Sequence, residues 1–133
     1  MAEKLEQAQI DTISRYDSEQ RLKYLLKEVC KNREIWILTD DIGCVMLNSE
    51  DEDCVPVWPN EAFARVWATG EWQDCQAEAI PLNQWHSRWT PGLIEDELSV
   101  AVFPNQTEEG IVLYPDELDF ELKNQAKKGQ NRK

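Results

Sequence analysis

Apolar residues in the first quarter of the chain recur every three or four positions, which is the spacing of one face of an α-helix. Asp17 or Ser18 is placed to cap this helix, and Gln20, three residues after Asp17, completes a capping box. The N-terminal part of the chain is therefore predicted to be helical. The residues on the apolar face are Leu22, Leu25, Leu26, Val29 and Cys30.

Two β-hairpins are predicted where runs of β-branched and aromatic residues flank turn residues. The first turns at residues 40–43, because aspartates bond to nearby backbone amides and Gly43 accepts a positive φ. The second turns within residues 104–110. We expect antiparallel pairing in both. The strands expected to pair are those around Ile37 and Val45, and those around Val102 and Val112.

Two further extended segments are predicted outside the hairpins. Residues 54–58 form a short strand, in which Pro56 removes one ladder donor and favours an edge position or a strand start. Residues 75–80 have the composition of a strand or an extended link.

Three more helices are predicted from their caps and breakers. Asn60 caps the first, which runs through Ala68. Pro81 suits the first turn of the second, which is expected to end at Pro91-Gly92, and Pro115 starts the third. The residues expected to face inward are Phe63, Val66 and Trp67 in the first, Leu82, Trp85 and Trp89 in the second, and Leu118 and Leu122 in the third.

The predicted strands and helices do not alternate regularly along the chain. This order predicts an α+β fold, with helices packed on a mostly antiparallel sheet. A chain of 133 residues is expected to form a single domain with one core. We assign this domain to residues 1–122. Residues 123–133 carry five positive charges and no negative ones, and are expected to form a basic, disordered tail.

The composition favours a protein of the cytoplasm. There is no run of about twenty apolar residues, and the N-terminus lacks the apolar stretch of a signal peptide. The cysteines show no two-residue spacing of a zinc or redox motif, and His86 is the sole histidine. We therefore expect reduced thiols, no metal and no cofactor, with a reactive or metal-binding thiol as the alternative. The cysteines are Cys30, Cys44, Cys54 and Cys75.

Charge is distributed very unevenly along the chain. Residues 34–122 contain twenty acidic residues and only two basic ones, Arg65 and Arg88. Such a body repels nucleic acid and acidic membranes and attracts a basic partner. The run Glu50, Asp51, Glu52 and Asp53 lacks the ligand pattern of a calcium loop, so we interpret it as a solvated loop or part of an acidic surface for a partner.

Two of the six tryptophans are candidates for partner contact. Trp58 stands before a proline at a strand end, and Trp72 follows Gly70-Glu71 in a loop. Tryptophan is frequent among interface anchors. The alternative is that both cover the edge of the core.

His86, with Arg88 two positions on, is the only group of residues close to catalytic chemistry. Histidine is the usual acid or base near neutral pH, and a nearby carboxylate would orient it. On a helix whose inward face holds Trp85 and Trp89, however, position 86 lies to one side, as a solvent-facing residue would. No catalytic residue is assigned, and His86 and Arg88 are included among the candidate contacts for a partner.

The order of several motifs closely resembles a bacterial family known only as domain of unknown function 2750. The resemblance covers residues 10–122, and residues 55–59, Val-Pro-Val-Trp-Pro, are its most specific part. A weaker likeness exists to the N-terminal domain of SseB-like secretion-associated proteins, and it favours a binding module. The family resemblance implies small, stand-alone proteins with no assigned activity, so it supplies no catalytic residues. The motifs are Arg15-Tyr16, residues 36–43, residues 55–59 with Ala62 and Ala64, Trp72, residues 80–82, Trp85 with Trp89, residues 100–104, residues 110–113 and residues 115–118.

Together these patterns favour a non-catalytic module that binds another protein with a basic surface. A narrower version is an immunity or antitoxin role, in which the acidic body masks a basic toxin. An enzyme centred on His86 is the alternative of a different class. The sequence leaves the oligomeric state open.

Overall fold

The computed structural model describes residues 7–41, 43, 45–49, 52–69, 72–104 and 111–130. The helices are α1 (Gln7–Ser14), α2 (Ser18–Asn32), α3 (Glu61–Trp67), α4 (Leu82–Gln84), α5 (Thr90–Glu95) and α6 (Pro115–Gln130), with a π-helical segment η2 (Trp85–Trp89) between α4 and α5. The strands are β1 (Glu34–Thr39), β2 (Leu47–Ser49), β3 (Glu52–Val57), β4 (Gln76–Pro81), β5 (Ser99–Val102) and β6 (Ile111–Leu113).

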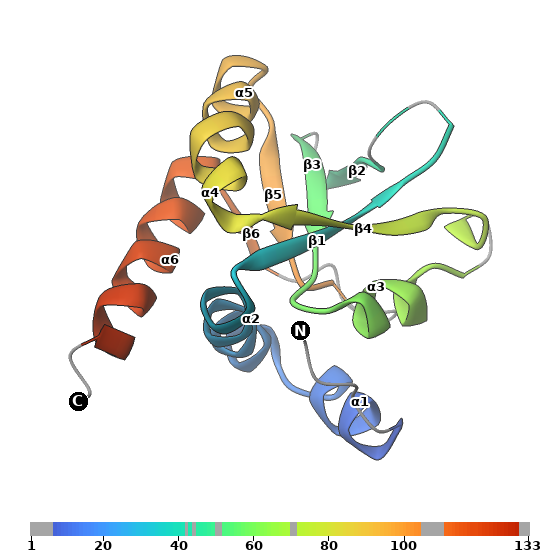
Figure 1. The fold of residues 1–133 in the computed structure, drawn as a ribbon. Helices are drawn as coiled ribbons and strands as arrows, with labels where there is room; N and C mark the ends of the chain where they lie inside the picture. Colours follow the sequence, from blue (N-terminus) through green and yellow to red (C-terminus); the bar gives the residue numbers. More distant parts are fainter. Residues whose placement is uncertain are drawn as a thin grey trace.

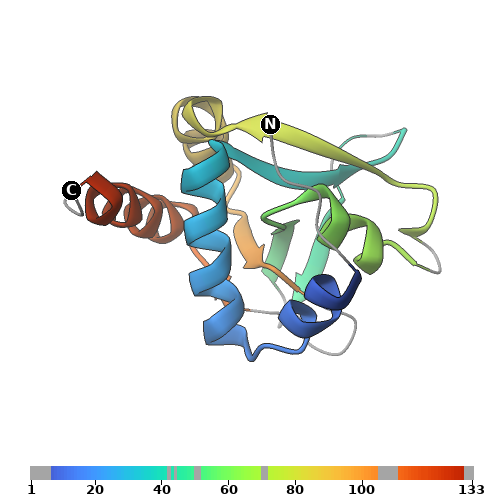
Figure 2. The ribbon, with the colours of Figure 1, turned by 60° about the horizontal axis from the view of Figure 1, so that its bottom comes forward.

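The strands form two sheets, in the orders β1-β4 and β2-β3-β5-β6. A two-way bridge joins the sheets, because the backbone N–H groups of Trp36 and Trp58 each donate to the other's carbonyl at 2.9 Å. Figures 1 and 2 show β1 and β4 running across the strands of the second sheet, with the helices packed around them. The ladders are antiparallel except for β3–β5, which is parallel. The predicted α+β fold with a mostly antiparallel sheet is confirmed.

The strand pairing of the second predicted hairpin is confirmed, while residues 105–110 of its turn lie outside the described residues. The first hairpin is confirmed only at its turn. β5 and β6 pair antiparallel, with Val102 opposite Ile111. At the first turn the N–H of Val45 donates to the Leu38 carbonyl at 2.8 Å, but Val45 lies outside a strand. β1 instead forms its ladder with β4, the segment left open between strand and link. β4 has the same length as β1 and pairs with it along its whole length. The segment after Val45 instead forms β2, which pairs with β3.

The helix starts follow the predicted capping chemistry. The backbone N–H of Gln20 donates to Asp17 Oδ1 at 2.8 Å, and the N–H of Asp17 donates to Gln20 Oε1 at 3.2 Å, which completes the capping box. Asn60 Oδ1 accepts from the N–H of Ala62 at 2.9 Å at the start of α3. The prediction that Val66 faces inward is wrong, because Phe63 and Ala64 define the buried face of α3 and Val66 falls about 110° away from it.

The predicted helix stop at Pro91-Gly92 is also wrong. The helix continues without interruption from α4 through η2 to Glu95, and the N–H of Thr90 bonds to the Trp85 carbonyl five residues earlier. A proline inside an α-helix lacks a donor and its ring collides with the carbonyl four residues before it. A five-residue turn moves that carbonyl away, so the helix accommodates Pro91 at the start of α5.

The expected boundary between domain and basic tail falls inside a helix. α6 runs past Leu122 to Gln130, so residues 123–130 continue the helix that begins at Pro115. Alanine, lysine and glutamine favour helix, and lysines near a helix C-terminus interact favourably with its dipole. Within the described residues, no helix is long and apolar enough to cross a membrane.

Arg21 is a cation whose side chain is completely buried in the core. Its Nε donates to the Phe103 carbonyl at 2.9 Å and its Nη1 to the Tyr16 carbonyl at 2.5 Å. Next to this contact, the Nε1 of Trp58 donates to the Pro104 carbonyl at 3.1 Å. Phe103 has a φ of 49°, in the left-handed region. Arg21 and Trp58 thus bind successive carbonyls of the sharp corner that follows β5.

Candidate functional site

The two candidate contact tryptophans lie in and against the core. Trp58 is fully buried, and its ring lies 5.3 Å from that of Trp67. Trp72 is half-buried and stacks on the other side of this group, with its ring 5.7 Å from Trp67. An enclosed indole offers no surface to a partner, so Trp58 is a core residue that also bonds to Pro104. Trp72 keeps one accessible edge.

The acidic run at residues 50–53 is described only in part. Glu50 and Asp51 lie outside the described residues. Glu52 begins β3 and pairs with Ser49 of β2, and the side chain of Asp53 is exposed. Glu52 and Asp53 therefore lie on β3 of the second sheet, while His86 and Arg88 lie on η2. The fold separates these two parts of the predicted site.

His86 instead meets a carboxylate that the sequence did not suggest. His86 Nδ1 lies against Oδ1 of Asp119, 33 residues further along the chain on α6. The Oγ1 of Thr90 donates to the same oxygen at 3.2 Å, and Lys123 Nζ lies 3.6 Å from Oδ2. An ionised carboxylate only accepts, so Nδ1 is the donor in this contact, and in a neutral ring Nε2 is then the acceptor. Arg88 is exposed. The resulting cluster of His86, Thr90, Asp119 and Lys123 joins the π-helical turn to α6.

Trp85 lies beneath this cluster. Its side chain is fully buried and its ring is nearly parallel to that of Trp89, at 5.6 Å and 12°. Among the described residues its Nε1 has no hydrogen-bond partner. The π-helical turn begins at Trp85, which places His86 towards α6 while both indoles remain packed inside.

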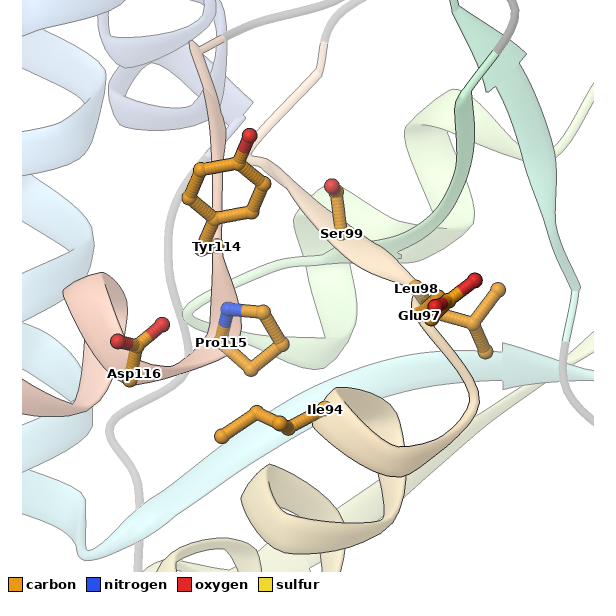
Figure 3. Close-up of a pocket in the computed structure, with 7 residues that line it drawn as sticks. All are labelled: Ile94, Glu97, Leu98, Ser99, Tyr114, Pro115 and Asp116. Atoms are coloured by element: carbon orange, nitrogen blue, oxygen red, sulfur yellow. The ribbon is translucent and has the colours of Figure 1, made fainter.

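An open hollow lies one helical turn away from this cluster, between the end of α5 and the start of α6. Its volume is about 270 Å³. Figure 3 shows Ile94 on one side, Pro115 and Tyr114 on another, and Ser99 behind them. Ile94 follows Thr90 by four residues and Asp116 precedes Asp119 by three, so the same two helices build both features. The lining residues are Ile94, Glu97, Leu98, Ser99, Tyr114, Pro115 and Asp116.

The rim of the hollow combines exposed apolar surface with negative charge. Ile94 is 49 % exposed and Tyr114 is 59 % exposed. Such an arrangement can bury an apolar group while attracting cations around it. Tyr114 and the acidic runs on both sides were visible in the sequence, but nothing local indicated that the two runs meet. The exposed acidic residues next to it are Glu95, Asp96, Glu97, Asp116 and Glu117.

The described cysteines Cys30, Cys54 and Cys75 are free thiols, and Cys44 lies outside the described residues. Burial raises the pKa of Cys30, whose thiol also donates to the Leu122 carbonyl at 3.3 Å. Burial also raises the pKa of Cys75, with a smaller contribution from Asp40 and Asp74. A raised pKa disfavours the reactive thiolate. The described part of the chain contains no group of three or more His, Cys, Asp or Glu side chains able to hold a metal.

The comparison with protein families agrees with the motifs. The family model described as "Protein of unknown function (DUF2750)" matches residues 22–122, which is more than half of the chain. The chain belongs to the DUF2750 family. The matched region of this DUF2750 protein runs from α2 into α6 and includes the hollow and, except for Lys123, the cluster around His86. No curated protein and no solved structure matches the chain.

Proposed function

We propose that this DUF2750 protein is a non-catalytic protein-binding module of the cytoplasm, whose partner presents a basic surface. The observation that carries the proposal is the hollow beside α5 and α6, which exposed Ile94 and Tyr114 line together with the carboxylates of Glu97 and Asp116. Neither Glu97 nor Asp116 forms an ion pair with another described residue. Their charge is therefore free to act on a partner.

The size of the hollow favours a protein partner over a small molecule. Pockets for small ligands enclose about 300–1,000 Å³ and bury most of their ligand. The present hollow is smaller, at about 270 Å³, and open to solvent. It suits a single apolar side chain of a larger partner, inserted while the backbone of that partner stays outside.

The charge of the body would act mainly on the rate of encounter. Twenty acidic residues against two basic ones between Glu34 and Leu122 attract a basic surface over long range. Screening acts within about 10 Å at 0.1 M salt, so association should slow as salt rises. Glu50, Asp51, Glu52 and Asp53 would contribute to this steering. Masking of a basic toxin, as an immunity protein does, is one form that such binding could take.

The proposal is tested by titrating a pentapeptide into isotope-labelled protein and following amide shifts by NMR. The peptide has leucine at its centre and two lysines on each side. Shifts should appear around Ile94 and Tyr114, and Ile94→Ala should weaken binding roughly tenfold because the apolar contact is lost. Met46→Ala is the matched control, since Met46 is 48 % exposed on another part of the molecule.

Two peptide variants separate charge from apolar contact. Replacing the leucine by alanine should weaken binding, and replacing the lysines by glutamates should abolish it. Equal effects of Ile94→Ala and Met46→Ala would contradict the proposal. So would an absence of shifts near the hollow at peptide concentrations up to about 1 mM.

An enzyme centred on His86 is a second candidate, favoured by the Asp119 carboxylate at Nδ1. This contact fixes the tautomer and leaves Nε2 available as a base, as a catalytic histidine requires. The two candidates separate in cells that depend on the protein. Under the binding proposal, His86→Gln leaves the cellular phenotype intact, whereas Ile94→Ala weakens it. Loss of the phenotype in a folded His86→Gln protein would support the enzyme.

A further inference from the structure

The outer side of α6 has a charge pattern that shares only Asp116 with the hollow. Asp116, Phe120, Lys123 and Lys127 follow one another at spacings of four, three and four residues, so they lie within about 60° of arc. We call these four residues the α6 stripe. All four are exposed, and Phe120, at 64 %, is a large apolar side chain in water.

All four residues of the α6 stripe are open to solvent, although Asp116 also lines the hollow and Lys123 Nζ lies 3.6 Å from Asp119 Oδ2. Leu118 and Leu122 are buried on the other side of α6, which packs on α2 and α5. Figures 1 and 2 both show α6 at one edge of the molecule, with its outer side uncovered. A helix with its own apolar face already buried has no packing reason to keep an exposed phenylalanine between charges.

We propose that two copies of the chain pair through the α6 stripe, with their α6 helices antiparallel about a two-fold axis. The stripe is self-complementary in this orientation. Its acidic residue lies at the N-terminal end and its two lysines towards the C-terminal end. A two-fold interface uses the same surface on both subunits, so each contact occurs twice.

One two-fold axis gives each of the four residues a partner on the other subunit. Positions 116 and 127 are equally distant from the midpoint between positions 120 and 123. Placing the axis at this midpoint sets Asp116 against Lys127 of the partner subunit. The same axis sets the Phe120 ring against Lys123 of the partner subunit, where the lysine stem covers the ring and the ammonium meets its face.

The charges exclude the other helix orientation. A parallel pair would bring Asp116 against its own copy and the lysines against theirs, and like charges in contact oppose association. The contact is one helix long, about 16 Å from Asp116 to Lys127, so the dimer should depend on concentration.

The test is sedimentation equilibrium of the full chain from about 1 µM to about 1 mM. The wild-type protein should form a dimer and no higher species. Lys127→Glu should raise the dimer Kd roughly tenfold, since it turns both ion pairs into repulsions. Phe120→Ala should raise it by a similar factor. Lys23→Glu, which makes the same change of net charge on α2, should change it no more than about twofold.

The combined variant Asp116→Lys/Lys127→Glu decides the register. It reverses both charges, restores the net charge, and should return the Kd to within about threefold of the wild type. Thermal unfolding of each variant checks that the monomer is folded. Ile94→Ala should leave the Kd unchanged, which keeps this inference separate from binding at the hollow. A monomer throughout the concentration range, or a dimer insensitive to Lys127→Glu, would overturn the proposal.

Discussion

In the described part of the chain the charged residues Arg21 and Asp119 are buried, and their surroundings differ in kind. Arg21 is completely enclosed, and its guanidinium bonds to the carbonyls of Tyr16 and Phe103. Asp119 lies at the edge of the core, and its carboxylate meets side chains, those of His86, Thr90 and Lys123.

The difference separates a permanent contact from an adjustable one. Backbone carbonyls do not titrate, and their positions are fixed by the strands and corner that carry them. Histidine and lysine can lose or gain a proton, and Lys123 stays mostly exposed to solvent. We conclude that Arg21 secures the corner after β5, whereas the Asp119 contacts hold α6 against η2 in a way that conditions can alter.

The largest expected effect comes from removing the enclosed cation. Arg21→Met keeps the apolar stem but leaves two buried carbonyls without their donor, so the free energy of unfolding should fall by about 3–5 kcal/mol in urea titrations. Arg15→Met, at an exposed position one turn before α2, should change it by about 0.5 kcal/mol or less. An Arg21→Met protein within about 1 kcal/mol of the wild type would remove the distinction between the two sites.

A smaller loss of unfolding free energy is expected for changes at Asp119 and His86. Asp119→Asn keeps an acceptor for Thr90 but removes the charge that faces His86 and Lys123, so it should cost about 1–2 kcal/mol. His86→Ala should cost about 1 kcal/mol or less. Because the two side chains touch, the double variant should cost less than the sum of the two single variants. Strict additivity would show that the His86 contact contributes nothing to stability.

The smallest effect concerns a tyrosine one turn after Arg21. Burial of Tyr24, with the neighbouring Glu28 and Tyr16 charges adding to it, raises its pKa from 10.0 to about 12. Below pH 10 the phenol is neutral in both folded and unfolded chains. Between about pH 10 and 12 the unfolded chain loses this proton first, so stability falls as pH rises. Tyr24→Phe should reduce the slope of unfolding free energy against pH in this interval. An unchanged slope would contradict the burial of the Tyr24 phenol in the folded protein.

The elements that were predicted correctly depend on local chemistry. The capping box of Asp17 and Gln20, the cap at Asn60 and the pairing around Val102 each follow from residues that are close in sequence or flank one turn. The helix through Pro91 was missed because the π-helical turn that tolerates the proline involves the packing of Trp85 and Trp89, which local propensity does not contain.

The site depends on contacts between distant residues, so less of it could be predicted. His86 was singled out, but its partner Asp119 lies on another helix. The sequence did contain a signal for Arg21 and Asp119, the two residues that were missed. Arg21 precedes Leu25 and Val29 by four and eight positions, and Asp119 precedes Leu122 by three, so each charged residue lies on a buried helix face. A charged residue in register with the core indicates a specific partner, although it does not identify one.

The π-helical turn makes chain length a constraint at this point of the molecule. η2 contains one residue more than an ordinary turn would need. Deleting one residue between Trp85 and Thr90 would rotate all of α5 by about 100° relative to α4. Thr90 would then turn away from Asp119 and Ile94 away from the hollow, while Pro91 would again collide with a carbonyl of the preceding turn. A shortened chain would need to lose the proline as well, so insertions, deletions and prolines in this segment should change together.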